Sequence, residues 1–387
     1  MAQNICDVVV IGAGILGCAV AHEVANRGLK VSLLDAGAIG QGTSGRSFSW
    51  INATSKTNDE AYFQLNAAGV KMYRALAQQW GAGKVGVHET GMVEWANAAD
   101  EIQLQTMWSA AKKLAAWGYA THTLDRKELE QLEPNISFNQ GAEGYLFPQD
   151  SWLDVPRYLQ FLTDHAQDAG ARIEEHCRVL ELLADDEGRV LGVLTEGGRI
   201  HCDSVVVATG ADTPEVLSLL TGYEGFATRF PVQVAPGFLL TAPAGESTCI
   251  QHVMYPPDSG GLHMRPAGDG KLLLGADDTD GMIANVQSKE TLAKATNILL
   301  QRAQQFIPKF EGVALAERCR SKIGIRVVPV DDRSIAGPML SAQGLYINLT
   351  HSGITLAPVL AKLIADSIEL SDIPDQLRPF NIDRFSS

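Results

Sequence analysis

The stretch Asp7-Val8-Val9-Val10-Ile11-Gly12-Ala13-Gly14-Ile15-Leu16-Gly17 decides the fold of this chain. Its β-branched opening is typical of a parallel strand that is buried on both faces. The glycines of a GxGxxG pattern follow at once and open a helix, which we expect over Ile15–Arg27. A second apolar run, Lys30–Leu34, ends at Asp35. This order predicts a strand, a helix and a second parallel strand that together bind a nucleotide.

Each glycine of the pattern has a mechanical role in dinucleotide binding. Gly12 makes the tight turn, Gly14 lets the backbone touch a pyrophosphate, and Gly17 lets helix and strand pack closely. The helix N-terminus adds free N–H groups and the positive end of its dipole. Asp35 suits ribose hydroxyls and would repel the 2′-phosphate of NADP. FAD and NAD remain as candidates, and a purely structural glycine turn is the alternative.

Composition and charge exclude several other classes of function. The chain has 387 residues, of which 45% are hydrophobic and 20% charged, enough for two lobes. A net charge of −14 without a Lys/Arg-rich block argues against nucleic-acid binding. The six cysteines are scattered, so we expect reduced thiols, no metal and a cytoplasmic protein. No apolar run reaches the ~20 residues that cross a bilayer, so no transmembrane segment is expected.

The remaining chain predicts a mixture of helices and strands. Helices are expected over Glu60–Trp80, Ala98–Trp117, Leu153–Ala169 and Lys289–Phe306, and from the loop His351–Gly353 to about Glu369. Strands are expected at Val179-Leu180, Val190–Thr195, around Ile200, Ser204–Gly210, Lys322–Val330 and Leu345–Leu349, and Phe226–Val286 is expected to be strand-like with turns.

Three further motifs stand apart from the opening unit: Thr43-Ser44-Gly45-Arg46-Ser47, Val205–Gly210, and Gly324–Asp331 with Ile335–Pro338 and Leu345–Leu356 downstream. In the first, small residues allow close approach and Arg46 can contact a phosphate, whereas the alternative is a solvated loop. The last helix should be capped by Ser352 or Thr355. A cap at Thr355 would put Pro358 at the third helical position, where its missing N–H costs little.

In this order, over Asp7–Arg384, the motifs resemble those of the D-amino-acid oxidase superfamily, which includes glycine oxidase, sarcosine oxidase and related amine dehydrogenases. The resemblance implies FAD rather than NAD. Sarcosine oxidases attach the flavin through a cysteine at the position of Gly324, so we expect FAD to be non-covalent here. The lysine that promotes oxygen reaction in sarcosine oxidase has no convincing match in Leu272–Gly275, which favours a dehydrogenase.

The resemblance also implies which residues contact FAD. The Thr43–Ser47 segment would lie against the pyrophosphate and the isoalloxazine, and Gly210 near the adenosine. The positive end of the last helix suits the negative charge of reduced flavin, unless that helix serves packing alone. The expected FAD-binding residues are Gly12, Ala13, Gly14, Ile15, Leu16, Gly17, Asp35, Ala36, Thr43, Ser44, Gly45, Arg46, Ser47, Thr209, Gly210, Gly324, Arg326, His351, Ser352, Gly353, Ile354 and Thr355.

Arg326 matches the arginine that clamps the substrate carboxylate in D-amino-acid oxidase and glycine oxidase. A guanidinium fork binds a carboxylate with two parallel hydrogen bonds. The alternative for Arg326 is a structural salt bridge to Asp331 or Asp332. The implied activity is oxidation of the carbon–nitrogen bond of a small amino acid or N-substituted amino acid. Hydride would pass to flavin N5, and the imine would hydrolyse to an oxo acid or aldehyde.

Three further residues are expected at the substrate. His263 stands where glycine oxidase has a substrate-side tyrosine, and both His263 and Tyr255 are either substrate contacts or structural residues. His351 matches a loop histidine beside the flavin. A flavin-dependent 2-hydroxy-acid dehydrogenase, with His263 or His351 as base, remains an alternative. An FAD-binding subunit of a larger dehydrogenase complex is another.

We therefore expect an α/β fold: a Rossmann-like FAD-binding domain interleaved with an α+β substrate domain on an antiparallel sheet. The FAD-binding domain should comprise residues 1–80, 146–222 and 320–387, and the substrate domain residues 81–145 and 223–319. Expected partners are an amino-acid-like small molecule and, as electron acceptor, O2, a quinone or an electron carrier. Homo-oligomerisation and peripheral membrane association stay open.

Overall fold

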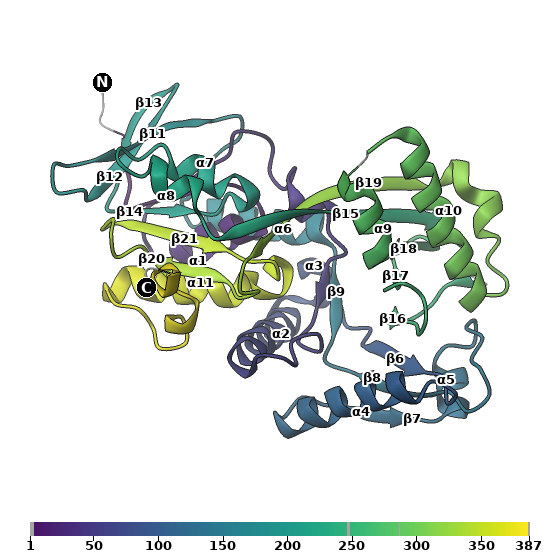
Figure 1. Ribbon diagram of the computed structural model, residues 1–387. Coiled ribbons are helices and arrows are strands. Elements are labelled where there is room, and N and C mark those ends of the chain that lie inside the picture. The colour runs from purple at the N-terminus through teal and green to yellow at the C-terminus, as the bar shows by residue number, and fades with distance from the viewer. Residues whose placement is uncertain (1–3, 246–247, 286, 386–387) are drawn as a thin grey trace.

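The structure is a computed structural model that describes residues 4–245, 248–285 and 287–385. Figure 1 shows two groups of elements joined by two long strands, β15 (Val232–Pro243) and β19 (Arg320–Pro329). These strands pair antiparallel from Val232 with Pro329 to Thr241 with Arg320.

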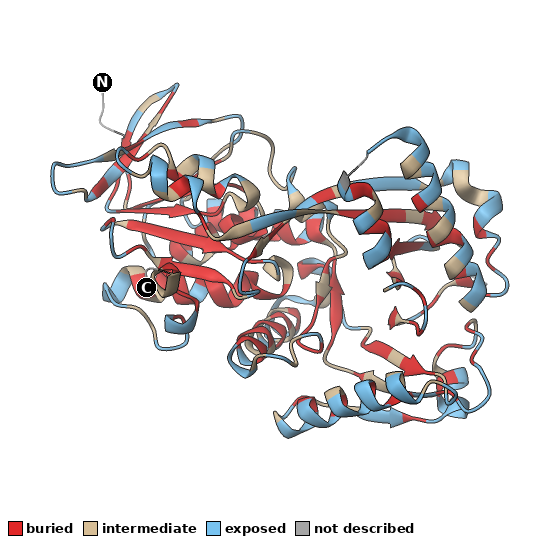
Figure 2. Ribbon diagram, in the orientation of Figure 1, coloured by how far each residue is buried: buried red, intermediate tan, exposed pale blue. Residues whose placement is uncertain are grey.

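The first group is built on a six-stranded sheet with the order β10-β3-β2-β14-β21-β20, parallel except between β20 and β21. Alternate residues of its strands enter two cores. Val8 and Val10 pack among helices, whereas Val9 and Ile11 face a four-stranded sheet. Figure 2 shows these strands as an almost continuous buried layer, as the unbroken apolar runs predict. The strands are β2 (Val8–Ile11), β3 (Val31–Leu34), β10 (Arg172–Glu174), β14 (Ser204–Val207), β20 (Ile335–Pro338) and β21 (Leu345–Leu349).

Helices and two small sheets complete this group. The helices are α1 (Ile15–Asn26), α2 (Glu60–Trp80), α3 (Ala82–Val85), α6 (Val155–Asp168), α7 (Thr213–Leu217), α8 (Glu224–Thr228) and α11 (Gly353–Leu370). The four-stranded sheet has β1 (Asn4–Ile5), β13 (Gly198–His201), β12 (Val190–Thr195) and β11 (Val179–Ala184), and the three-stranded sheet has β4 (Trp50–Ile51), β9 (Ser151–Leu153) and β5 (Val87–His88).

The second group is built on an eight-stranded sheet with the order β19-β15-β18-β17-β16-β6-β8-β7. All neighbours are antiparallel except β16 and β6. One face packs against α9 (Asp277–Asn285) and α10 (Lys289–Phe306). We call the other the inner face, and there Met92, Phe147 and Val253 contact the segment Phe48–Ala53. The other elements are β6 (Met92–Ala96), α4 (Glu101–Ala116), β7 (His122–Leu124), α5 (Arg126–Leu132), β8 (Glu143–Phe147), β16 (Val253–Tyr255), β17 (His263–Pro266) and β18 (Lys271–Gly275).

The predicted strand-like region Phe226–Val286 is partly wrong. It begins inside α8, and it includes the helix α9, whose first turn carries Asp277, Asp278 and Asp280. Carboxylates favour the positive end of a helix, so this acidic run is a start signal that apolar patterning does not detect. Val286 lies outside the described residues.

The start of α11 agrees with the first of the two caps predicted from the sequence, Ser352, and not with Thr355. The N-cap is Ser352, which makes no side-chain cap bond, and Thr355 lies inside the first turn. Pro358 is therefore within the helix, where it cannot donate to the carbonyl of Ile354. The hydroxyl of the fully buried Tyr73 on α2 donates to that carbonyl instead, at 2.7 Å. A side chain from a neighbouring helix thus satisfies the acceptor.

The predicted domain boundary at residue 320 coincides with the first residue of β19, which pairs with β15 across that boundary. The division into two domains stays a prediction. Across the described ranges, no helix combines the length and the apolar character needed to cross a membrane.

Candidate active site

The GxGxxG loop forms a cradle that side chains would fill. Gly12 has a φ of +101°, and a Cβ there would lie 2.7 Å from the Ala208 carbonyl oxygen. A Cβ on Gly17 would lie 1.8 Å from the Gly12 carbonyl oxygen. Both distances are too short for any side chain, so the loop requires glycine at both positions. The close approach of β2, α1 and β14 depends on them.

The open end of this cradle carries hydrogen-bond donors. No side chain caps α1 at Gly14, and the N–H of Ile15 donates to the Ser44 hydroxyl at 3.0 Å. The Asp35 carboxylate accepts from the N–H of Ala13 at 2.6 Å and of Gly37 at 2.7 Å. This helix start, where Ser44 accepts from the first N–H, and the fixed carboxylate fit a pyrophosphate and a ribose, respectively.

Three distant segments of the predicted FAD site converge beside the cradle. The Thr43 hydroxyl donates to the Ile325 carbonyl at 2.5 Å. A Cβ on Gly324 would lie 2.8 Å from the backbone oxygen of Arg46, so glycine permits this contact. The Thr355 hydroxyl donates to the Trp50 carbonyl at 3.2 Å. The segments after β3, within β19 and at the start of α11 therefore meet at one place.

Arg326 lies on the inner face, on β19, and its partner is Asp280. Its Nη2 donates to Asp280 Oδ2 at 2.7 Å and to the Pro236 carbonyl at 3.1 Å. The alternative partners named from the sequence are wrong, because Asp331 pairs with Arg384 at 2.8 Å and Arg326 pairs with neither Asp331 nor Asp332 in the described chain. About a third of the Arg326 side chain (34%) stays exposed, so the guanidinium can meet a ligand.

His263 and Tyr255 lie on neighbouring strands of the same face. Their rings are parallel, with centroids 6.4 Å apart, and Phe48 meets His263 edge-on at 4.6 Å. Burial lowers the pKa of His263, so the imidazole is neutral at physiological pH. Burial and Asp277 raise the pKa of Tyr255 to about 12, and its hydroxyl donates to Asp277 at 3.3 Å.

The sequence interpretation missed several charged residues around this face. Glu94 on β6 pairs in register with Tyr255, and burial raises the pKa of its carboxyl to about 7. Arg265 is buried, donates to the Phe48 carbonyl at 2.6 Å, and lies over the Trp152 ring at 4.3 Å. No local motif marks these residues, since only strand pairing brings them to the site.

His351 lies within electrostatic range of Lys56 and of Arg326. Solvent reaches the His351 ring, but the surrounding protein, Lys56 and Arg326 lower the pKa of His351 to about 4. Burial lowers the pKa of Lys56 to about 8. The FAD contacts expected of His351, Arg46, Ala36, Thr209 and Gly210 stay predictions.

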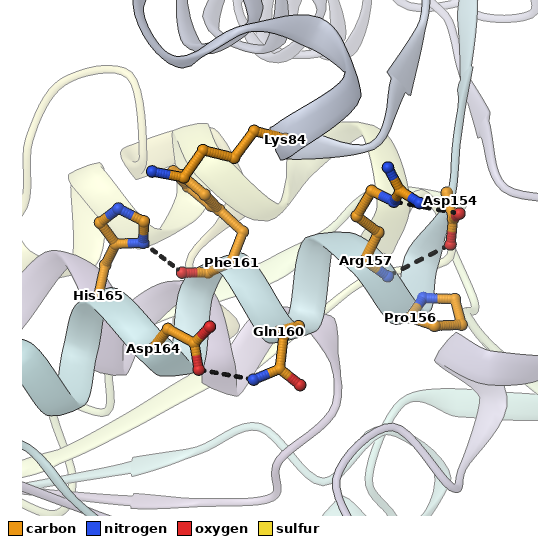
Figure 3. A pocket seen from close by; sticks show the side chains of 8 residues that line it. All are labelled: Lys84, Asp154, Pro156, Arg157, Gln160, Phe161, Asp164 and His165. Atoms are coloured by element: carbon orange, nitrogen blue, oxygen red, sulfur yellow. Dashed lines mark hydrogen bonds and ion pairs between the residues drawn. The ribbon is translucent and has the colours of Figure 1, made fainter.

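A surface depression with a volume of about 500 Å³ lies elsewhere, between α6 and α3. Figure 3 shows its lining, where Gln160 donates to Asp164 and Arg157 pairs with Asp154. None of the predicted site residues lines it. Lys84, the other cation of the lining, lies over the Trp80 ring at 4.7 Å, and the depression is separate from the inner face.

Comparison with known proteins matches most of the chain to one family. A family model described as FAD dependent oxidoreductase matches residues 7–367. A glycine oxidase from Geobacillus kaustophilus is 25% identical over 98% of this chain and 97% of its own length. A 4-methylaminobutanoate oxidase (formaldehyde-forming) from Paenarthrobacter nicotinovorans is 25% identical over 71% of this chain and 32% of that protein.

Solved structures show the same fold. The crystal structure of the Geobacillus kaustophilus glycine oxidase has a TM-score of 0.81 and 22% identity and covers 99% of both chains. That of L-proline dehydrogenase from P. horikoshii has a TM-score of 0.83 and 20% identity, covering 99% of this chain and 98% of the other. The predicted α/β fold class is confirmed.

Proposed function

Because this chain belongs to the FAD-dependent oxidoreductase family, we propose that it oxidises the carbon–nitrogen bond of a small amino acid or N-substituted amino acid. FAD is its cofactor. The substrate class is inferred from Arg326, whose side chain is partly exposed on the inner face. It lies beside a neutral histidine where residues 43–52 meet β19.

The residues of the cradle suit FAD on physical grounds. Gly12, Gly14 and Gly17 would leave room for the pyrophosphate at the start of α1, and Asp35 would accept from a ribose hydroxyl. The N-terminal end of α11 lies against β4 through Thr355, and its dipole favours negative charge there. These residues hold the cofactor in our proposal without a covalent bond.

The inner face would bind and orient the substrate. Arg326 would receive the carboxylate at Nη1, because Nη2 already donates to Asp280 and to the Pro236 carbonyl. His263, kept neutral by burial, would accept a hydrogen bond from the amine. Bound FAD would supply the hydride-accepting chemistry for oxidation of the substrate carbon. The imine product then hydrolyses in water to an oxo acid or aldehyde.

Anaerobic mixing of the FAD-loaded protein with D-, L- and N-methyl amino acids, and separately with 2-hydroxy acids, tests this proposal. We expect bleaching of the flavin absorption by amines, with stoichiometric release of ammonia or alkylamine. Bleaching by hydroxy acids alone would replace amine oxidation with alcohol oxidation. Bleaching by neither would contradict an enzymatic role of the isolated chain and favour a subunit of a larger complex.

A further inference from the structure

We propose that Arg265 is a positioning residue, which holds Phe48 against His263 and thereby sets how tightly the site binds the amine. The inference rests on the proposed function, because it takes His263 as a group that meets the substrate. Arg265 acts through Phe48 and needs no contact with the substrate itself.

Arg265 is a buried cation without a carboxylate partner. It is 6% exposed, and burial lowers its pKa to about 9, so the guanidinium is charged at neutral pH. No carboxylate of the described chain forms a salt bridge with it, and Asp154, whose charge opposes the change in pKa, pairs with Arg157 instead. A buried charge without a counterion destabilises a fold, so other contacts must compensate this guanidinium.

The compensating contacts of Arg265 lead to Phe48. Nε donates to the Phe48 carbonyl at 2.6 Å, and Nη1 donates to the Pro266 carbonyl at 2.7 Å. The guanidinium also lies over the Trp152 ring at 4.3 Å and over the Phe48 ring at 5.5 Å. A planar fork can donate to two carbonyls and stack on a ring at once, which a lysine ammonium cannot reproduce in the same geometry.

The backbone after Phe48 has a conformation that needs such support. Ser49 is buried and has a φ of +61°, in the left-handed region that residues other than glycine rarely adopt. The N–H of Leu153 donates to the Ser49 carbonyl at 2.9 Å, so Arg265 and Leu153 hold two consecutive carbonyls. An unfavourable backbone conformation persists only where its surroundings fix it. Arg265 therefore helps to fix the direction in which the Phe48 side chain leaves the backbone.

Phe48 contacts His263 from outside the sheet that carries the histidine. Within that sheet, Nδ1 of His263 lies 3.0 Å from the Gly261 carbonyl oxygen, and the ring occupies the space above Gly275. The Phe48 ring meets the imidazole edge-on, with centroids 4.6 Å apart. Because a carbonyl can only accept, the neutral imidazole carries its proton on Nδ1 and offers Nε2 to the amine. A displaced Phe48 would let the ring turn, so the hold on Phe48 sets the position of Nε2.

Arg157 supplies a matched control. Its Nη1 also donates to a backbone carbonyl, that of Gly83 at 2.8 Å, but 59% of its side chain is exposed and it lines the separate depression. Substitution by lysine at either position keeps the positive charge and removes the planar fork. Only Arg265→Lys changes the hold on Phe48.

The test measures the amine concentration that half-saturates anaerobic bleaching of the FAD-loaded protein. We expect Arg265→Lys to raise it about tenfold and to change the limiting rate by less than about twofold, because a binding contact is misplaced. Phe48→Leu, which removes the ring but keeps the carbonyl, should also raise it about tenfold. In the Phe48→Leu background, Arg265→Lys should add less than about twofold, since its effect passes through the ring. Arg157→Lys should leave the half-saturating concentration unchanged.

Histidine ring signals in NMR spectra give a readout that needs no turnover. The His263 signal is assigned by its loss in His263→Gln. It should shift in both Arg265→Lys and Phe48→Leu, because each substitution moves or removes the ring beside it. It should stay in place in Arg157→Lys.

The outcomes are separable. Unchanged half-saturation in Phe48→Leu overturns the inference even if Arg265→Lys fails to fold, and so do fully additive effects of the two substitutions. If amines bleach the flavin of Arg265→Lys at unaltered concentrations, the inference fails while the proposed function stands. If no amine reacts but the His263 signal follows both substitutions, the proposed function fails and the contact that Arg265 maintains stands.

Discussion

Two glycines give the inner face its shape. A Cβ on Gly237 would lie 3.2 Å from Arg326 Nε, and one on Gly275 would lie 2.4 Å from His263 Nε2. The guanidinium and the imidazole occupy the space that side chains on β15 and β18 would need. The positions of both functional groups therefore depend on residues that have no functional group themselves.

Gly275→Ala should displace the His263 ring, because a real Cβ cannot lie 2.4 Å from a ring nitrogen. We expect weaker substrate binding with FAD binding retained, measured as the amine concentration that half-saturates anaerobic bleaching. Gly281→Ala is the control, since nothing lies within 4 Å of a Cβ there and the residue is inside α9. It should stabilise the protein by about 0.5–1 kcal/mol. Unchanged half-saturation in Gly275→Ala would refute a substrate role for His263.

Arg326→Lys keeps a cation for Asp280 but removes the planar fork. We expect half-saturation by the best amine to rise about 30-fold or more, which corresponds to roughly 2 kcal/mol of lost carboxylate binding. Arg302→Lys, in the exposed pair with Asp278, should leave it unchanged. An unaltered concentration dependence in Arg326→Lys would show that another group anchors the substrate.

At the level of elements, the positions of α11 and β4 depend on a few buried polar groups. The Thr355 hydroxyl accepts from the N–H of Asn52 at 3.1 Å and donates to Trp50. A Cβ on Gly69 of α2 would lie 2.2 Å from the Thr355 carbonyl oxygen, so α2 also packs closely here. Because Pro358 cannot donate to the Ile354 carbonyl, α11 depends on the hydrogen bond that Tyr73 of α2 donates to that carbonyl.

Tyr73→Phe should destabilise the protein by about 1–3 kcal/mol, because the buried carbonyl of Ile354 would lose its donor. Pro358→Ala restores a backbone N–H to that carbonyl, so Tyr73→Phe should cost less in the Pro358→Ala background. A double-mutant cycle by denaturant unfolding measures this coupling. Strict additivity of the two changes would contradict the assignment.

Asp150 should make stability depend on pH. It is fully buried, accepts from Trp50 Nε1 at 3.1 Å, Thr54 Oγ1 at 2.9 Å and Tyr119 OH at 2.5 Å, and burial raises its pKa to about 7. The unfolded pKa is about 3.9, so the unfolded chain loses this proton first. The stability contributed is complete below about pH 4 and is lost as pH rises towards 7. Asp150→Asn should flatten the pH dependence of the unfolding free energy, and an unchanged slope would exclude Asp150 as its source.

For the whole molecule, contacts between residues that are close in the sequence could be predicted, and contacts between distant residues could not. The nucleotide cradle was predictable because its glycines and strands are adjacent in the chain. The partner of Arg326 was not, because the neighbouring Asp331 and Asp332 are plausible by sequence, whereas Asp280 lies 46 residues away and meets Arg326 only through strand pairing and the packing of α9. Glu94 and Arg265 were missed for the same reason. The family motifs predicted which segments converge but not which charges surround them.

The central claim is that the cradle and the segments around β4, β19 and the start of α11 converge on one flavin ring. Hydrogen–deuterium exchange of the apoprotein with and without FAD tests it most directly. We predict simultaneous protection of residues 12–17, 43–52, 324–326 and 350–355 when FAD binds. Protection confined to residues 12–17, with the other three segments exchanging as in the apoprotein, would contradict it.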